Sequence, residues 1–245
     1  MNNKIMKTQL KGIVMSGIFI QSFAFIFGQT ATLDGYGPPA ITRVTLYQQS
    51  LLNHPEKQMV SLAKIPGIIM DLRYSSENNF MHKRLYPKNT KISFLRKPAF
   101  QALGQVAKEL ACKGLVPVIF DAYRPYTTTV TLWNPIKDER YAANPSKGSG
   151  HNRGTAVDLT LADSKTHQLL AMPTDFDSFS DSAHQNFKGT DKNRISNREL
   201  LKQVMKKYGF IPLPTEWWHF SWPDAEKFEL LDLSFKQLSE LQKSY

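Results

Sequence analysis

A glycine turn between a histidine and an aspartate constrains this chain more than any other feature. His151 stands seven residues before Asp158, and Gly154 lies between them. Residues 155–161 alternate between two faces, which predicts a strand with Val157, Leu159 and Leu161 on the buried face and Asp158 on the other. Because an odd separation reverses direction along a strand, Gly154 must bend the chain if both side chains are to meet one ion.

A second candidate segment, Glu-Trp-Trp-His at 216–219, lies between Pro214 and Pro223. The two prolines leave little room for a helix, and the aromatic residues favour extended structure. In a regular strand Glu216 and His219 would face opposite ways, so we expect a turn or bulge there.

Together the two segments offer two imidazoles, one carboxylate ligand and a spare glutamate. A catalytic zinc site needs three protein ligands, a fourth position for water and a base beside it. Taken singly, each segment has a simpler interpretation: residues 149–161 can form a surface turn capped by an aspartate, and residues 216–219 an aromatic core strand with a hydrogen-bonded histidine. Only the combination indicates metal chemistry.

The N-terminus predicts export. Residues 1–28 read as a signal peptide, with a basic head followed by an apolar stretch that polar residues interrupt. An uncleaved membrane anchor is the alternative, since the stretch is nearly long enough to span a bilayer. The interruptions and the small residues Gly28 and Ala31 favour cleavage, so we expect an exported, periplasmic protein without stable membrane insertion after cleavage.

The rest of the chain suits one globular domain. Residues 29–60 lack a clean period and predict an exposed, extended leader, and residues 61–245 predict the folded domain. The formal net charge is +10 and becomes +7 without Lys4, Lys7 and Lys11, because residues 1–28 contain no acidic residue. The remaining basic residues are scattered, so we expect no nucleic-acid partner. The sequence does not indicate an oligomeric state.

Periodicity predicts several elements. Residues 68–74 and 115–120 read as strands, and residues 98–112 as a helix with one buried face, on whose apolar side the single cysteine, Cys112, is expected to be a buried thiol. Ser196 and Glu199 form a capping box that predicts a helix closing at Gly209. The mixture predicts an α+β domain with helices packed on a central antiparallel or mixed sheet that bears the zinc site.

Three segments stand in this order: Asp-Ala-Tyr-Arg-Pro at 121–125, Ser-Gly-His-Asn-Arg-Gly-Thr-Ala-Val-Asp-Leu-Thr-Leu at 149–161, and Glu-Trp-Trp-His at 216–219. Together they closely resemble the zinc-dependent D-alanyl-D-alanine dipeptidases, which are related to the D,D-carboxypeptidases of peptidoglycan metabolism. Weaker matches lie at 71–74, 79–80 and 172–177, with His184 downstream. The resemblance covers roughly residues 60–225.

The resemblance implies a role for each matching residue. One Zn²⁺ per chain would be bound by His151, Asp158 and His219, with Glu216 as general base and acid and Arg124 steadying the oxyanion. Asp177 and Tyr74 would hold the ammonium of a small D-amino-acid dipeptide, and Ser149 its terminal carboxylate. For Tyr74 and Ser149, a satisfied core tyrosine and a turn-capping serine remain alternatives.

The implied activity is hydrolysis of the D-alanyl-D-alanine dipeptide to two D-alanines in cell-wall turnover. Two other functions stay open at this point. One is a D,D- or L,D-carboxypeptidase acting on longer muropeptides, and the other is a non-catalytic cell-wall-binding module, which would not require a base beside the metal.

Overall fold

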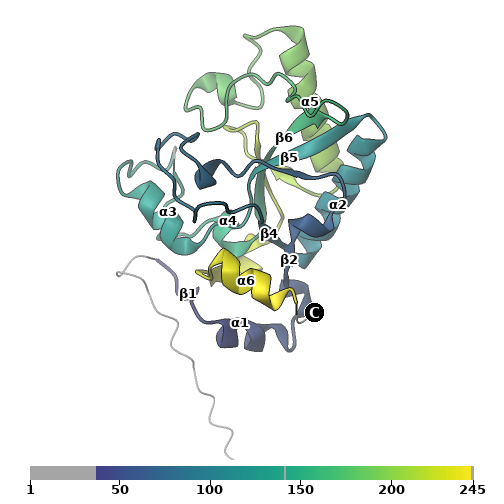
Figure 1. The fold of residues 1–245 in the computed structure, drawn as a ribbon. Helices are drawn as coiled ribbons and strands as arrows, with labels where there is room; N and C mark the ends of the chain where they lie inside the picture. Colours follow the sequence, from purple (N-terminus) through teal and green to yellow (C-terminus); the bar gives the residue numbers. More distant parts are fainter. Residues whose placement is uncertain (1–36, 141, 244–245) are drawn as a thin grey trace, which may run out of the picture.

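The computed structural model describes residues 37–140 and 142–243, and its core is a five-stranded sheet (Figure 1). The strand order is β3-β5-β6-β8-β7. The strands are β3 (Ile69–Met70), β5 (Leu115–Asp121), β6 (Ala156–Asp163), β8 (His219–Ser221) and β7 (Ile211–Pro212). β3 pairs with β5 in parallel, and the other neighbours are antiparallel, so the sheet is mixed. This confirms the predicted α+β architecture.

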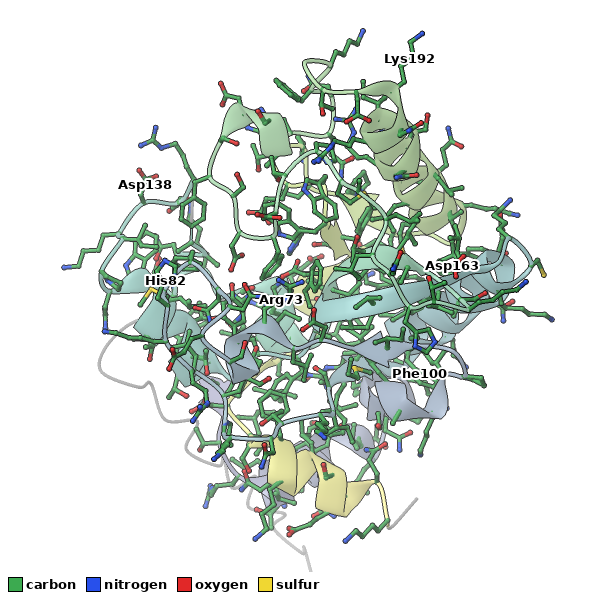
Figure 2. The ribbon with its side chains drawn as sticks, turned by 45° about the horizontal axis from the view of Figure 1, so that its top comes forward. Arg73, His82, Phe100, Asp138, Asp163 and Lys192 are labelled. Carbon is green, nitrogen blue, oxygen red and sulfur yellow. The ribbon has the colours of Figure 1, made fainter. Side chains whose placement is uncertain are left out.

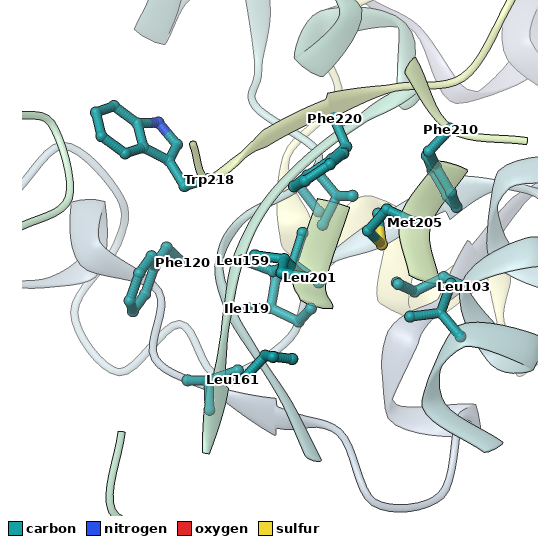
Figure 3. Close-up of a cluster of buried hydrophobic side chains, with 14 of the residues drawn as sticks. Leu103, Ile119, Phe120, Leu159, Leu161, Leu201, Met205, Phe210, Trp218 and Phe220 are labelled. Carbon is teal, nitrogen blue, oxygen red and sulfur yellow. The ribbon is translucent and has the colours of Figure 1, made fainter. Parts of the chain in front are cut away.

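Two long helices, α2 (Lys97–Ala111) and α5 (Lys192–Lys207), cover one face of this sheet (Figure 1). Figure 3 shows Leu103 of α2 and Met205 of α5 on one side of the central strands, while Phe120 and Trp218 lie on the other. The two sides follow from strand alternation, because neighbouring residues such as Ile119 and Phe120 point to opposite faces. One face of the sheet therefore forms the helix-covered core, and the other is left for the site.

Helix α2 forms because small and apolar residues recur at helical spacing. Its buried residues are Ala99, Ala102, Leu103, Val106, Ala107 and Leu110, and Pro98 lies in its first turn, as expected. Gly114 follows the helix with φ +73°. Cys112 caps the helix and is exposed, so the prediction of a buried thiol is wrong, because the apolar stripe ends at Leu110.

Helix α5 begins at Lys192, earlier than the capping box at Ser196 predicted. The side chain of Asp191 accepts a hydrogen bond from the backbone N–H of Arg194 and so caps the helix. Lys192 projects from the edge of the molecule (Figure 2). Leu201, Val204 and Met205 form the buried apolar stripe of this helix.

The predicted strand at 68–74 is also shorter than expected. Only Ile69–Met70 pair with β5, and the chain then turns into a short 3-10 helix, η4 (Arg73–Ser75), that carries Tyr74. The guanidinium of Arg73 lies 4.1 Å from the centroid of the Phe120 ring, which is on the side of the central strands opposite Leu103 and Met205 (Figure 3).

The smaller elements surround this core. The helices are α1 (Val44–Leu51), α3 (Tyr126–Trp133), α4 (Gly150–Arg153) and α6 (Phe235–Leu241). The further 3-10 helices are η2 (Pro55–Lys57), η3 (Leu62–Lys64), η5 (Asp181–Ala183) and η6 (Ala225–Lys227). The strands β1 (Ala40–Ile41) and β9 (Leu230–Leu231) pair in parallel, and β2 (Met59–Ser61) pairs with β4 (Phe94–Arg96) in an antiparallel ribbon.

The exposed leader expected at 29–60 is wrong for residues 37–60, which are folded into the domain. Tyr47 of α1 is buried, and its hydroxyl accepts a hydrogen bond from the backbone N–H of Met59. The buried guanidinium of Arg96 donates to the carbonyls of Lys57, Arg153 and Glu229 and so joins this segment to the domain. Residues 29–36 and the expected signal peptide at 1–28 lie outside the described residues.

Candidate active site

Two neighbouring strands and a one-turn helix bring the three predicted metal ligands together. Asp158 of β6 and His219 of β8 are register partners, and His219 Nδ1 lies 2.8 Å from Asp158 Oδ1. His151 of α4 points its Nε2 to within 3.3 Å of Asp158 Oδ2 and 3.2 Å of His219 Nδ1. The three ligand atoms all lie within 4.8 Å of one another, so one cation can contact them all.

Helix α4 orients His151 through its two ends. At the start, the Ser149 hydroxyl accepts a hydrogen bond from the backbone N–H of His151, and the Asn152 side chain accepts one from the backbone N–H of Ser149. At the end, Gly154 takes a left-handed conformation with φ +70° and turns the chain into β6. This is the bend predicted at Gly154, and it lets His151 and Asp158 share one ion despite their odd separation.

The outer ring nitrogens of both histidines have partners that suit metal ligands. His151 Nδ1 lies 2.7 Å from the carbonyl oxygen of Ala122, which can only accept, so Nδ1 is the donor and Nε2 is the ring nitrogen that can bind a metal. His219 Nε2 lies 3.1 Å from the Ser221 hydroxyl, so Nδ1 is the ring nitrogen that faces Asp158 and His151. Outer partners of this kind fix the ring orientation of metal-binding histidines. Two imidazoles and one carboxylate therefore fit a catalytic zinc ion.

Charges in this cluster are balanced locally. Burial alone would raise the pKa of Asp158, but the two histidines, by charge and hydrogen bonding, lower it well below its ordinary value. Burial would likewise lower the pKa of His219, whereas the Asp158 carboxylate raises it. Asp158 is thus held as the anion that a cation requires.

Arg124 lies beside the metal-ligand cluster, three residues after the end of β5. Its Nε and Nη2 both lie 2.8 Å from Asp121 Oδ2, and Nη2 lies 3.8 Å from Asp158 Oδ2. Burial would lower the pKa of Arg124, but the charge of Asp121 raises it, so the guanidinium stays charged. The backbone carbonyl of Arg124 is held by the amide of Asn152 at 2.8 Å.

Asp121 is a site residue to which the sequence interpretation gave no role. It is fully buried, and its Oδ1 accepts hydrogen bonds from the Tyr86 hydroxyl at 2.6 Å and from the Ala122 backbone N–H at 2.9 Å. The sequence does hold a signal for this role: Asp121 follows a continuous apolar strand, and a carboxylate buried there needs a partner of opposite charge or a hydrogen-bond donor. Ser221 was missed as well, although it lies two residues after His219 and so shares its side of β8.

Glu216 lies in the turn between β7 and β8, which agrees with the local turn expected in this segment. Its Oε2 is 3.9 Å from His219 Nδ1, and its side chain is 28% exposed. Burial raises the pKa of Glu216 above its usual value. The carboxylate therefore lies close to the metal-ligand cluster, and its protonated form is favoured more than in a solvent-exposed glutamate.

Tyr74 and Asp177 form a hydrogen-bonded pair that lines the same cavity as Glu216. The Tyr74 hydroxyl donates a hydrogen bond to Asp177 Oδ2 at 3.1 Å. Burial, and after it the charge of Asp158, raises the pKa of Asp177 well above its usual value. The Tyr74 ring also faces the Arg124 guanidinium at 5.0 Å. A cationic group of a ligand would relieve the cost of burying this carboxylate.

All eight residues predicted from the sequence line one cavity of about 280 Å³. They are Tyr74, Arg124, Ser149, His151, Asp158, Asp177, Glu216 and His219. Trp218 also lines the cavity, whereas Trp217 does not and donates from its indole N–H to the Thr174 hydroxyl oxygen. The volume lies just below the ~300–1,000 Å³ of pockets for drug-sized ligands, so the cavity suits a small substrate.

Known proteins match this chain over the region that forms the site. A family model described as D-Ala-D-Ala dipeptidase matches residues 55–240. The chain is 35% identical over 175 residues to a D-alanyl-D-alanine dipeptidase of Escherichia coli K12, covering 71% of this chain and 89% of the relative. It is 32% identical over 176 residues to a D-alanyl-D-alanine dipeptidase of Enterococcus faecium, covering 64% of this chain and 86% of the relative. The structure of a vancomycin-resistance D,D-pentapeptidase, VanY, with Zn(II) is similar over 56% of this chain and 77% of that one, with 15% identity and a TM-score of 0.36.

Proposed function

This chain belongs to the D-Ala-D-Ala dipeptidase family, and from that premise we propose that it is a zinc metallopeptidase that hydrolyses the D-alanyl-D-alanine dipeptide to two D-alanines during cell-wall turnover. One observation carries the proposal: the His-Asp-His cluster, the glutamate beside it and the groups suited to both ends of a dipeptide all line the same small cavity.

The metal would be held by His151, Asp158 and His219, through Nε2, a carboxylate oxygen and Nδ1. When bound, zinc supplies a Lewis acid that polarises a carbonyl and lowers the pKa of water. Ser221 would support this ligand set through the His219 ring, and Asp121 holds Arg124 beside it.

Glu216 would act as general base and then as general acid. Its carboxylate takes a proton from the attacking water and returns it to the nitrogen of the leaving D-alanine, so the same side chain serves both steps. The pKa that burial raises in Glu216 suits this exchange, because a base with a higher pKa holds the proton better between the steps.

Arg124 would stabilise the negative charge that develops on the attacked carbonyl oxygen. The guanidinium is already fixed by Asp121, so little reorganisation is needed when the charge appears.

The ends of the dipeptide would be recognised by opposite charges and by a hydroxyl. Asp177, supported by Tyr74, faces the free ammonium, and Ser149 faces the terminal carboxylate. The Ser149 hydroxyl accepts a bond from the His151 N–H, and its own O–H remains available to donate to a carboxylate. Capping the helix and binding the substrate are therefore compatible roles for Ser149.

The decisive experiment compares substrates with purified protein. D-Ala-D-Ala, L-Ala-L-Ala, N-acetyl-D-Ala-D-Ala and a pentapeptide ending in D-Ala-D-Ala are incubated with and without chelator, and the amino acids released are quantified. We expect chelator-sensitive release of D-alanine from the free dipeptide, and much slower cleavage of the N-acetylated dipeptide, because Asp177 would lose its partner.

Other outcomes would identify the alternatives. Preferential cleavage of the pentapeptide would make the protein a carboxypeptidase of longer muropeptides. A folded protein with no metal-dependent hydrolysis of any substrate would indicate a wall-binding module. Glu216→Gln is the matched control, since it keeps the shape of the side chain and removes its ability to act as a base.

We further propose that the protein is exported and acts in the periplasm, on the strength of the basic and apolar character of residues 1–28. Within residues 37–140 and 142–243, no helix is long and apolar enough to cross a membrane. Cell fractionation, with N-terminal sequencing of the mature protein, tests the proposal. Recovery of an uncleaved chain from the cytoplasm would contradict it.

A further inference from the structure

The position of the Glu216 carboxylate depends on the backbone of its turn. No hydrogen bond to this carboxylate is formed by another described side chain, and its nearest charged partner, His219 Nδ1, is 3.9 Å away. The position of the Glu216 carboxylate is therefore set by the contacts that hold the backbone of residues 214–217.

Gln185 contacts this turn three times. Its backbone N–H donates to the carbonyl of Pro214 at 2.9 Å, and its side-chain Nε2 lies 3.1 Å from the carbonyl oxygen of Glu216 and 3.4 Å from that of Trp217. Because both carbonyls are acceptors, only the NH₂ end of the amide can face them. Gln185 is 7% exposed, so these bonds are shielded from water.

The chemistry of the buried Gln185 amide favours a positioning role. Its Oε1 is buried without a hydrogen-bond partner among the described residues, which is a cost that packing alone does not require. An apolar side chain of the same length would fill this space without that cost. The donated bonds to the turn are the feature that only an amide supplies.

Arg198 of α5 holds Gln185 from behind. Its guanidinium Nη1 lies 2.7 Å from the carbonyl oxygen of Phe187 and 3.2 Å from that of His184, on either side of Gln185 in sequence. Arg198 is 2% exposed. A continuous set of hydrogen bonds thus connects the long helix α5, through residues 184–187, to the turn that carries Glu216.

We infer that Gln185 is a positioning residue for the general base: it fixes the turn at 214–217 so that the Glu216 carboxylate stays beside the metal site. This inference rests on the proposed function of Glu216. Gln185 itself does not line the cavity and has no contact with substrate in this account.

The test measures kcat and KM for D-Ala-D-Ala, together with zinc content and melting temperature, in Gln185→Met. Methionine keeps the length of the side chain and removes the donor. Misplacing a catalytic group by about 1 Å can cost on the order of 10²-fold in rate, so we expect kcat to fall at least about tenfold. KM should stay within about twofold and zinc at its wild-type content, because the ligands and the ammonium site are untouched.

Gln242→Met is the matched control. The Gln242 amide also joins distant backbone segments, donating to the Met59 carbonyl at 2.9 Å and accepting from the Ser61 N–H at 3.1 Å, but it lies outside the cavity. Both variants should lose similar thermal stability, and only Gln185→Met should lose kcat. If Gln185→Met does not fold, Gln185→Asn, which keeps an amide that is one methylene too short, takes its place with the same expected fall in kcat.

Equal kcat in the Gln185 and Gln242 variants would overturn the inference, as would a parallel loss of zinc and kcat in the Gln185 variant. Failure of the proposed function has a different signature. In that case Glu216→Gln would itself retain wild-type turnover, whereas a failure confined to Gln185 leaves Glu216→Gln inactive.

Discussion

Asp121 shows how a residue outside the reaction can decide whether the site works. Its carboxylate is buried against the Arg124 guanidinium and accepts two further hydrogen bonds, from Tyr86 and from the backbone of Ala122. Burial raises the pKa of Asp121, and the charge of Arg124 opposes this rise. The pair is therefore a buried ion pair whose two halves depend on each other.

Asp121→Asn should lower kcat/KM for D-Ala-D-Ala by about 10²-fold, the cost typical of losing one oxyanion-stabilising donor, because Arg124 is no longer fixed. Tyr86→Phe is the control: it removes one bond to the same carboxylate and keeps the ion pair, so it should cost about 1 kcal/mol of unfolding free energy and little activity. Steady-state kinetics and urea unfolding measure both. Similar kinetics in the two variants would argue against the role given to Asp121.

Ser221 makes a prediction about metal affinity. Its hydroxyl is the partner of His219 Nε2, so Ser221→Ala should weaken zinc binding by about 10–100-fold, as the loss of a hydrogen-bond partner of a metal-binding histidine typically does. Competition with a chelator of known affinity measures the change. Unaltered zinc affinity would mean that the His219 ring is oriented by packing alone.

At the scale of elements, the turn between α4 and β6 fixes the distance between two ligands. Gly154 has φ +70°, and a Cβ there would come within 2.5 Å of Met59 Sδ. Gly114 has the similar φ of +73°, but a Cβ added to it would meet no atom of the described residues within 4 Å. Substituting either glycine would therefore strain the backbone, because both have a positive φ. Only at Gly154 would the new side chain also clash with a neighbour, and only Gly154 lies next to the metal ligands.

Gly114→Ala should cost about 1–2 kcal/mol of unfolding free energy, the penalty for a left-handed alanine. Gly154→Ala should cost more, since Met59 must move, and it should also reduce zinc affinity because His151 shifts relative to Asp158. Chemical unfolding and zinc titration separate the effects. Equal losses in both variants, with unchanged zinc affinity, would contradict the account of this turn.

Hydrophobic periodicity predicted the helices and strands whose pattern is set by residues close together in sequence. The apolar stripe and Pro98 define α2, and alternation defines β6, so both lie where expected. The start of α5 was missed because Asp191 and Ser196 are both acceptable caps, and only the packing of α5 decides between them. The eight cavity residues were predicted from the resemblance. The partners of Asp121 were not predicted, because they depend on a register irregularity between Ile119 and Asp121 that no local sequence pattern reveals.

At the scale of the whole molecule, the N-terminal part of the domain is held by contacts that are distant in sequence. Strand β1 pairs with β9, and Tyr47 is buried in a cluster that includes residues of α6. No hydrophobic period exists in residues 37–60 because each short piece packs against a different partner. This explains why the segment resembles an exposed leader when considered alone.

A variant that begins at residue 54 should therefore be less stable than one that begins at residue 29. Removing the buried side chains of Ile41 and Tyr47 forfeits about 1.5–3 kcal/mol for each large apolar side chain, so a loss of at least about 3 kcal/mol is expected. Thermal and urea unfolding compare the two variants. Equal stability would mean that this segment is an appendage after all.

The central claim is that His151, Asp158 and His219 hold one zinc ion beside Glu216, and the most direct measurement is the zinc content of purified variants. Wild type and Glu216→Gln should each contain one zinc per chain, while alanine at any of the three ligand positions should leave the content far below one. Stoichiometric zinc in a folded ligand variant, or its loss in Glu216→Gln alone, would contradict the account.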